Sequence, residues 1–236
     1  MGPKKLTRAA VHTKRKNLIS ENSDFALVEA YKTARTNMMF SLAAASSKVV
    51  VFTSCAPVEG KSMTCVNMAL ALAQTGSNVL VIDADMRKPT IHSLLRITSS
   101  KGLSTVLGKF CGLEKALEKD VYPNLDVMIA GTIPPNPAEL LASSQMGELL
   151  SVLESHYDFI LIDSPPVSVV SDTLLLSRLI AGYVFIVREG YTTHGAIEQA
   201  LQSISLAEGK VLGFMKVGCK PQGKGYYQYN YRYEYK

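Results

Sequence analysis

The stretch Ser54-Cys-Ala-Pro-Val-Glu-Gly-Lys61-Ser62 constrains this chain most, because it joins an apolar β-branched run to a helical pattern. The run 48–53 predicts a buried strand, and residues 63–74 carry apolar side chains at helical spacing. A strand, a loop ending in Gly-Lys-Ser and a helix form the layout of a phosphate-binding P-loop. We expect the loop N–H groups to bind phosphate, with Lys61 at the terminal phosphates and Ser62 as a Mg²⁺ ligand.

One position departs from the usual P-loop spacing. Cys55 stands six residues before Lys61, where the motif has glycine. On these residues alone, a chance Gly-Lys-Ser at a helix start explains the pattern equally well, and two carboxylate motifs further along favour the P-loop. The nucleotide-binding residues that this predicts are Pro57, Val58, Glu59, Gly60, Lys61, Ser62 and Met63.

The carboxylate motifs each follow a predicted buried strand. They are Leu80-Val-Ile-Asp83-Ala-Asp85-Met-Arg87 and Phe159-Ile-Leu-Ile-Asp163-Ser-Pro-Pro166. Ligands of parallel sheets bind at the carboxyl ends of the strands, and Mg²⁺ prefers carboxylate, water and phosphate oxygens. A single aspartate there is commonly a turn residue or a helix cap, whereas three beside a P-loop indicate a nucleotide site.

Specific roles follow from this placement. We expect the metal ligands to be Ser62, Asp83 and Asp163, and the catalytic residues to be Lys61, Asp83, Asp85 and Arg87. Either Asp83 or Asp85 would accept the proton of an incoming hydroxyl.

The order of apolar runs and helical patterns along the chain predicts an α/β fold. Apolar runs predict strands at 48–53, 78–82, 125–129, 159–162, 183–187 and 211–217. Helical patterns cover 25–45, 63–74, a broken region 90–119, 138–154, 172–181 and 195–208. Alternating strands and helices predict a mostly parallel central sheet covered by helices on both faces, as in P-loop NTPases. The predicted units are a flexible basic arm at 1–20, one domain at 21–220 and a disordered tail at 221–236.

Composition indicates the cellular compartment and the distribution of charge along the chain. Four cysteines without a Cys-x-x-Cys pair predict a reduced, cytosolic protein, and there is no apolar run of 18 residues or signal-peptide pattern. Residues 1–16 hold six basic side chains and no acid, so the other 19 basic and 20 acidic residues carry a net charge of only −1. The arm could contact an anionic surface, although a solvated terminus is the simpler interpretation.

Tyrosine dominates the C-terminal segment. Six of the 11 tyrosines lie there, at Tyr226, Tyr227, Tyr229, Tyr231, Tyr233 and Tyr235. Such a low-complexity segment cannot bury both of its faces, so we expect it to be disordered.

Together these motifs resemble the bacterial tyrosine kinases of the capsule or exopolysaccharide type, whose Walker A, A′ and B motifs look like segments 54–62, 81–87 and 160–166. The resemblance extends from about residue 20 to the C-terminus. It includes Glu29-x-x-Lys32-x-x-Arg35, where the family typically has Glu-x-x-Arg-x-x-Arg and uses it to pack subunits into a ring. Lys32 departs from that pattern, because lysine lacks the bidentate fork of arginine.

The resemblance implies an autophosphorylating kinase that uses ATP and Mg²⁺, with the six tail tyrosines as acceptors in a neighbouring subunit. It also implies a homo-oligomeric ring, a separate transmembrane activator or polysaccharide co-polymerase, and a cognate tyrosine phosphatase. The protein would then lie peripherally at the inner face of the cell membrane. Adenine recognition is inherited from the resemblance, since Val217 or Gly218 stands where related NTPases often have asparagine.

Two other functions compete with this one. Positioning ATPases of the MinD or ParA kind share the strand-end aspartates, but they have a signature lysine where Ala56 stands, five residues before Lys61. A nucleic-acid binder would explain tyrosines mixed with basic residues, yet stacking platforms need a rigid groove that a flexible tail lacks. We therefore expect no nucleic-acid partner.

Overall fold

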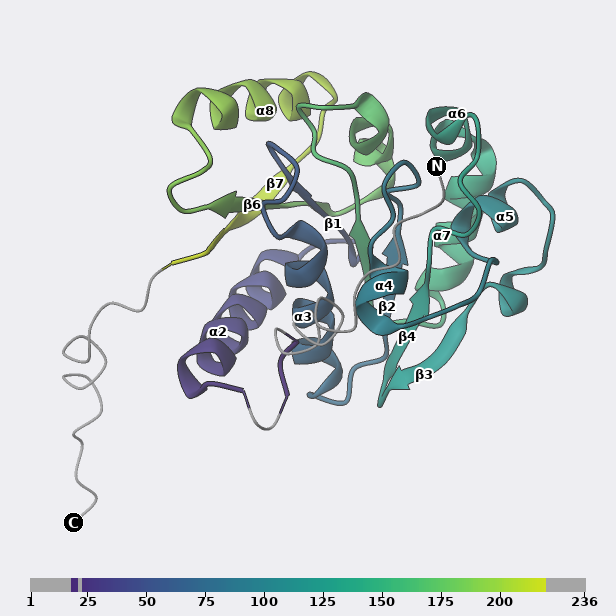
Figure 1. The fold of residues 1–236 in the computed structure, drawn as a ribbon, viewed down its shortest axis with the longest axis horizontal. Coiled ribbons are helices and arrows are strands. Elements are labelled where there is room, and N and C mark those ends of the chain that lie inside the picture. Colours follow the sequence, from purple (N-terminus) through teal and green to yellow (C-terminus); the bar gives the residue numbers. More distant parts are fainter. Residues whose placement is uncertain (1–17, 21–22, 220–236) are drawn as a thin grey trace, which may run out of the picture.

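The computed structural model describes residues 18–20 and 23–219. The tail predicted at 221–236 and nearly all of the arm predicted at 1–20 lie outside these residues, so their predicted disorder stays a prediction. The described part is built on a seven-stranded sheet in the order β3-β4-β2-β5-β1-β6-β7 (Figure 1). The strands are β1 (Val49–Ser54), β2 (Val79–Asp83), β3 (Glu118–Tyr122), β4 (Leu125–Met128), β5 (Phe159–Asp163), β6 (Gly182–Arg188) and β7 (Val211–Val217).

All neighbouring strands pair in parallel except β3, which runs antiparallel to β4. β1 lies in the middle, between β5 and β6. Its register sets Phe52 opposite Asp163, and the β2–β5 register sets Asp83 opposite Asp163. The mostly parallel sheet predicted from the sequence is therefore confirmed, and both carboxylate motifs end beside the P-loop strand.

Helices cover both faces of the sheet, as predicted. On one face, Val50 and Phe52 pack in a core with α2, α3 and α4; on the other, Val49 and Val51 pack with α5, α6, α7, η2 and α8. Alternate residues of β1 serve the two cores because successive strand side chains point to opposite faces. The helices are α2 (Phe25–Leu42), α3 (Lys61–Ala73), α4 (Ile91–Leu95), α5 (Leu103–Leu107), η1 (Leu113–Lys115), α6 (Pro137–Ala142), α7 (Ser144–Glu154), η2 (Ser171–Leu179) and α8 (His194–Leu206).

Three predicted helical regions were wrong in detail. Region 90–119 holds two short helices, one 3₁₀ turn and the start of β3, whose sequence is too polar to look like a strand. The helix predicted at 138–154 is divided at Ser143, which has an extended conformation and occupies the position directly before α7. The segment predicted as a helix at 172–181 forms the 3₁₀ helix η2.

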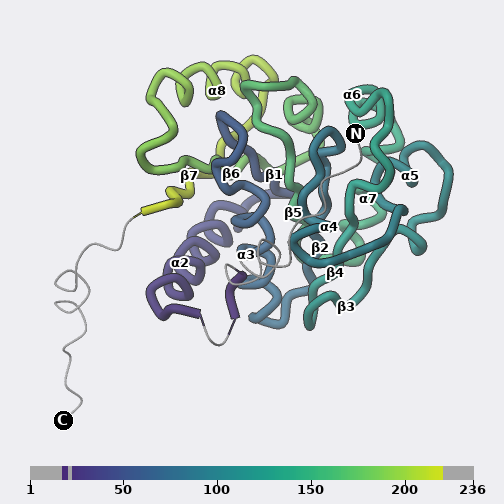
Figure 2. The backbone as a smooth tube through the Cα atoms, in the orientation of Figure 1, coloured from purple at the N-terminus to yellow at the C-terminus, as the bar shows by residue number. Residues whose placement is uncertain are grey.

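The first helix packs with one face against elements that are far from it in sequence. The tube in Figure 2 shows α2 beside α3 and near β7, and residues of both elements contact α2. The Tyr31 hydroxyl accepts a hydrogen bond from Asn67 Nδ2 at 3.2 Å, and Arg35 Nη1 donates to the Ala71 carbonyl at 2.8 Å. Among the described residues, no helix is both long and apolar enough to span a membrane.

Candidate active site

The P-loop lies between the carboxyl end of β1 and the first turn of α3, as the sequence predicts. Gly60 directly precedes Lys61 at φ +92°, a left-handed conformation that glycine adopts without a steric penalty. Val58 also has a positive φ of +67°, which is rare for a β-branched residue. The loop is therefore held in a specific shape, with the N-terminus of α3 open to an anion.

Lys61 joins the three sequence motifs. Its Nζ lies 3.0 Å from Asp85 Oδ2, 3.4 Å from Asp163 Oδ1 and 3.3 Å from Ser62 Oγ. Burial lowers the pKa of this ammonium, but Asp163 and Asp85 outweigh that effect and the net pKa is raised. Lys61 is thus a buried cation at the point where the P-loop and both carboxylate motifs meet.

Asp83 is fully buried and accepts three backbone hydrogen bonds. Its Oδ1 accepts from the Asp85 N–H at 3.2 Å, and its Oδ2 accepts from the N–H groups of Thr90 and Ile91, each at 3.1 Å. Burial, and then the nearby Asp163 carboxylate, raise the pKa of Asp83 to about 8. The side chain therefore organises the β2–α4 turn as well as facing the site.

Asp163 has the free coordination capacity that a metal ligand needs. Its Oδ2 is buried and lacks a hydrogen-bond partner, and burial raises the pKa of the carboxyl although Lys61 and Ser62 oppose the shift. Among the described residues, no three Cys, His, Asp or Glu side chains form a ready metal cage. Mg²⁺ in P-loop sites takes most ligands from phosphate and water, so one carboxylate and the Ser62 hydroxyl fit this ion.

Arg87, predicted as catalytic, is held by a partner that the sequence did not identify. Its Nε and Nη2 donate to the two carboxylate oxygens of Asp172 at 2.8 and 3.0 Å. Asp172 is buried in η2, whereas the Arg87 side chain is 44% exposed. This ion pair places Arg87 apart from the contacts that Lys61 makes, and no local sequence signal links residues 85 positions apart.

Further contacts around the P-loop could not be predicted from the sequence. Glu59 is buried and bonds to Thr192, and Arg188 bonds to the Val58 carbonyl. Val217 lies beside the loop as well, since a Cβ on Gly60 would lie 3.7 Å from its Cγ2. The ends of β6 and β7 therefore flank the P-loop.

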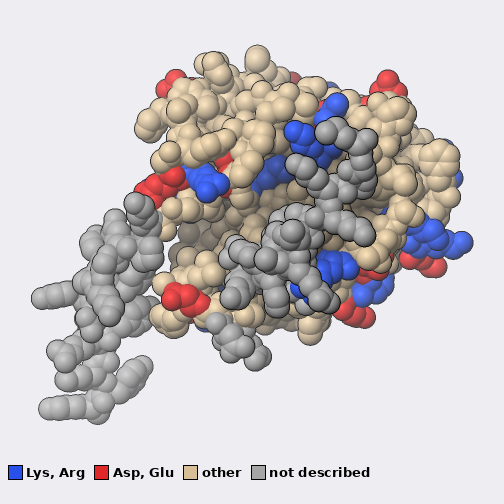
Figure 3. All heavy atoms as spheres, viewed as in Figure 1, with Lys and Arg blue, Asp and Glu red and all other residues tan. Residues whose placement is uncertain are grey.

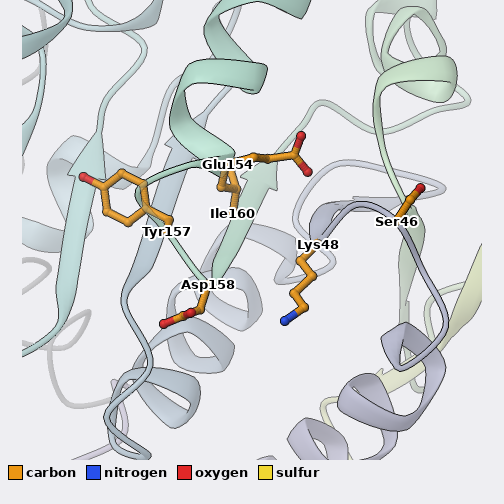
Figure 4. A pocket seen from close by; sticks show the side chains of 6 residues that line it. All are labelled: Ser46, Lys48, Glu154, Tyr157, Asp158 and Ile160. Carbon is orange, nitrogen blue, oxygen red and sulfur yellow. The ribbon is translucent and has the colours of Figure 1, made fainter.

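A hollow of about 320 Å³ lies at the opposite edge of the sheet, before the amino ends of β1 and β5. Figure 4 shows its lining side chains, which are Ser46, Lys48, Glu154, Tyr157, Asp158 and Ile160. None of the predicted site residues is among them, so this hollow is separate from the candidate active site.

Lys and Arg atoms form several groups on the described surface that is visible in Figure 3. Lys and Arg atoms are interspersed there with Asp and Glu atoms. This agrees with the nearly neutral charge of the chain after residue 16.

Comparison with known proteins agrees with these motifs. Residues 47–212 match the family described as an AAA domain. The chain is 38% identical over 201 residues to the tyrosine-protein kinase YwqD of Bacillus subtilis (strain 168), a match covering 85% of each chain. It is 34% identical over 221 residues to the putative tyrosine-protein kinase CapB of Staphylococcus aureus, covering 93% of each.

Solved structures give the same result. The kinase domain of the Escherichia coli tyrosine kinase ETK superposes with a TM-score of 0.80 and 30% identity, covering 87% of this chain and 80% of that one. The septum site-determining protein MinD of Pyrococcus horikoshii reaches a TM-score of 0.61 at 20% identity over 71% of this chain and 68% of that one, a likeness of fold alone. A longer relative, the tyrosine-protein kinase wzc of Salmonella typhimurium, is 33% identical over 88% of this chain, which is 29% of its own length.

Proposed function

The chain belongs to the bacterial protein-tyrosine kinases built on a P-loop fold, and from this premise we propose which residues transfer phosphate and to what acceptor. The proposed reaction moves the γ-phosphoryl group of ATP to tyrosine hydroxyls in the segment 221–236 of a neighbouring copy. By this autophosphorylation the protein would regulate the synthesis and export of a capsule or exopolysaccharide. One observation carries the proposal: Lys61 Nζ lies within 3.4 Å of side chains from all three motifs.

Each motif has a separate task in this proposal. Lys61 and the N–H groups of residues 57–63 bind the β- and γ-phosphates, and the ammonium neutralises charge on the transferring group. Asp85 or Asp83 accepts the tyrosine proton. Burial and Asp163 raise the pKa of Asp83 to about 8, which favours proton uptake, whereas Asp85 bonds directly to the phosphate-binding lysine. Phosphoryl transfer has a loose transition state, so positioning and charge neutralisation supply most of the acceleration.

Mg²⁺ would be held by Ser62 and Asp163, with Asp83 close by. When bound, the ion neutralises negative charge on the β- and γ-phosphates. The unpartnered Oδ2 of Asp163 supports this assignment, because a buried carboxylate oxygen without a donor is costly unless a cation approaches it. Arg87, fixed by Asp172, would act from the rim of the site.

Assembly is proposed to use α2. Glu29 and Lys32 pair at 2.8 Å on its surface, and Phe25 and Phe40 are 72% and 76% exposed on the same helix. We infer that Glu29, Lys32 and Arg35 help to join copies into a ring, in which a tail reaches the neighbouring site.

The remaining partners follow from family membership. We propose a separate transmembrane activator or co-polymerase, a peripheral location at the inner face of the membrane through that partner, and a cognate tyrosine phosphatase. The match to 29% of the longer relative wzc supports the first of these, because in that protein the kinase unit is joined to a much longer chain.

Phosphotyrosine mapping by mass spectrometry after incubation with Mg·ATP tests the function. We expect phosphate on the tail tyrosines of the wild type, and at least about a hundredfold less on Lys61→Met, because a preorganised charge at the transferring group is lost. Lys115→Met removes an exposed lysine of η1, outside the three sequence motifs, and should behave as wild type.

Phosphotyrosine on Lys61→Met at the wild-type level would contradict the assignment. A wild type that hydrolyses ATP briskly but never labels its own tyrosines would indicate a positioning ATPase instead.

A further inference from the structure

Three side chains connect the P-loop to the turn between β6 and α8. Glu59 belongs to the loop, Arg188 is the last residue of β6, and Thr192 lies in the turn that follows β6. We propose that these residues form a clasp that holds the P-loop in its nucleotide-binding shape, so that the β6–α8 turn helps to set nucleotide affinity. The three clasp side chains act by positioning the loop, because none of these side chains is assigned a contact with the transferring phosphate.

Glu59 is the centre of the clasp. The residue is 1% exposed, although it lies in a short loop and carries a carboxylate. Its Oε2 accepts the Ala56 N–H at 2.9 Å, and its Oε1 accepts a hydrogen bond from the Thr192 hydroxyl. A buried carboxylate needs such donors, so both bonds are strongly favoured.

Two hydrogen bonds fix the backbone on either side of the Ala56 Cα. Its N–H is bonded to Glu59, and its carbonyl accepts from the Ser54 hydroxyl at 2.9 Å. The Ala56 N–H therefore faces the carboxylate, and the phosphate must be bound by the amides that follow it. This arrangement holds the first half of a loop that lacks the usual glycine at position 55.

Thr192 links the carboxylate to the backbone of the turn. Its Oγ1 donates to Glu59 and also accepts the Arg188 N–H at 2.8 Å. The hydroxyl thus donates its hydrogen to Glu59 and accepts the Arg188 N–H with a lone pair. Movement of the turn away from the P-loop would break the bond to Glu59.

Arg188 makes the second connection. Its Nη1 donates to the Val58 carbonyl at 2.7 Å, and its guanidinium lies 5.9 Å from the centre of the Tyr191 ring. Val58 is the residue with the unfavourable φ of +67°. A strained backbone persists only when surrounding contacts hold it, and this hydrogen bond is one of them.

The expected consequence is a change in nucleotide affinity rather than in chemistry. Without the clasp, the P-loop would sample other conformations, and binding would have to restore the competent one. The apparent dissociation constant should rise, while the rate at saturating ATP should stay close to that of the wild type. This inference rests on the proposed function only for nucleotide binding, which can be measured without any phosphorylation.

The test compares two adjacent threonines. Thr192→Val keeps the shape of the side chain but removes the hydroxyl that bonds to Glu59. Thr193→Val is the matched control, because the Thr193 hydroxyl caps α8 by accepting the Ala196 N–H at 3.3 Å and makes no contact with the P-loop among the described residues. Thr192→Ser restores the hydroxyl and should rescue binding.

The measurements are the dissociation constant of N-methylanthraniloyl-ADP with Mg²⁺, the KM for ATP and the kcat. We expect Thr192→Val to raise the dissociation constant and the KM about tenfold, as for loss of a hydrogen bond to a charged group, with kcat within about twofold. Thr193→Val should lower the melting temperature without changing the dissociation constant. Arg188→Met, an exposed substitution that leaves the core intact, should also weaken binding.

Equal dissociation constants for the wild type, Thr192→Val and Arg188→Met would overturn the clasp. If the two threonine variants lowered the melting temperature alike and bound nucleotide alike, Thr192 would be merely structural. If affinity changed as expected but no tyrosine were ever phosphorylated, the clasp would stand and the proposed kinase reaction would fall.

Discussion

Asp83 has an elevated pKa that links folding to pH. Burial and the Asp163 carboxylate both disfavour its ionised form and raise the pKa to about 8, from 3.8 in an unperturbed side chain. Between these two values, the folded chain retains a proton that the unfolded chain has released. Because the folded state then binds more protons, the free energy of unfolding falls as the pH rises through this interval.

Asp83→Asn should remove this dependence in metal-free protein, since an amide does not titrate. Urea unfolding should show that the free energy of unfolding falls more between pH 5 and pH 8 for the wild type than for the variant. Asp158→Asn changes an exposed carboxylate at the other edge of the sheet and should follow the wild type. Identical pH profiles for the wild type and Asp83→Asn would show that Asp83 is ionised throughout in the folded protein.

At the scale of elements, α2 combines two tasks that the sequence does not separate. Glu29 and Lys32 form a surface pair, with side chains 38% and 48% exposed. Arg35, from the same motif, instead donates to the Ala71 carbonyl near the end of α3, where a cation also interacts favourably with the helix dipole. Glu29 and Lys32 can therefore contact another copy, whereas Arg35 also anchors α2 within its own chain.

Substitutions in α2 should separate these tasks. We expect Glu29→Ala with Lys32→Ala to weaken assembly while barely changing the melting temperature, because exposed ion pairs contribute little to stability. Arg35→Ala should lower the free energy of unfolding by about 1 kcal/mol, the typical contribution of one hydrogen bond. Light scattering and thermal unfolding measure the two effects. An unchanged mass for the double variant would remove this surface pair from the interface.

The central elements were predictable because local patterns determine them. The runs around β1, β2 and β5 are apolar throughout, and aspartates after parallel strands must meet at one edge of the sheet. β3 was not predictable, since Glu118, Lys119 and Asp120 make a polar edge strand that owes its form to pairing with β4. The Glu59–Thr192 and Arg87–Asp172 contacts join distant segments, so only the tertiary structure reveals them.

For the whole molecule, the distribution of charge matters most. The chain carries a net charge of +5, made up of +6 in residues 1–16 and −1 in the remaining residues. Each phosphate on tyrosine adds about −1.5 to −2 at neutral pH, so several on one tail would reverse the sign of the whole chain. Phosphorylated copies should then repel one another, and phosphorylated tails should compete for Mg²⁺ and the P-loop, which favours dissociation of a ring.

Replacing the six tail tyrosines with phenylalanine tests this coupling, because phenylalanine keeps the ring and removes the acceptor oxygen. The substituted residues are Tyr226, Tyr227, Tyr229, Tyr231, Tyr233 and Tyr235. We expect the variant to lose most phosphotyrosine yet still to phosphorylate the tail of an added Lys61→Met protein. It should also remain oligomeric in Mg·ATP, whereas the wild type shifts to smaller species as charge accumulates.

The mixture of the two variants separates acceptor from catalyst, since each chain lacks what the other supplies. Phosphotyrosine on the tail of the Lys61→Met chain must come from transfer between copies, because that chain lacks the phosphate-binding ammonium and the other chain lacks the tail tyrosines. A change in oligomer size should follow the appearance of phosphotyrosine in time, and a phosphatase should reverse it. If the six-phenylalanine variant dissociated in Mg·ATP as readily as the wild type, nucleotide binding rather than tail charge would control assembly.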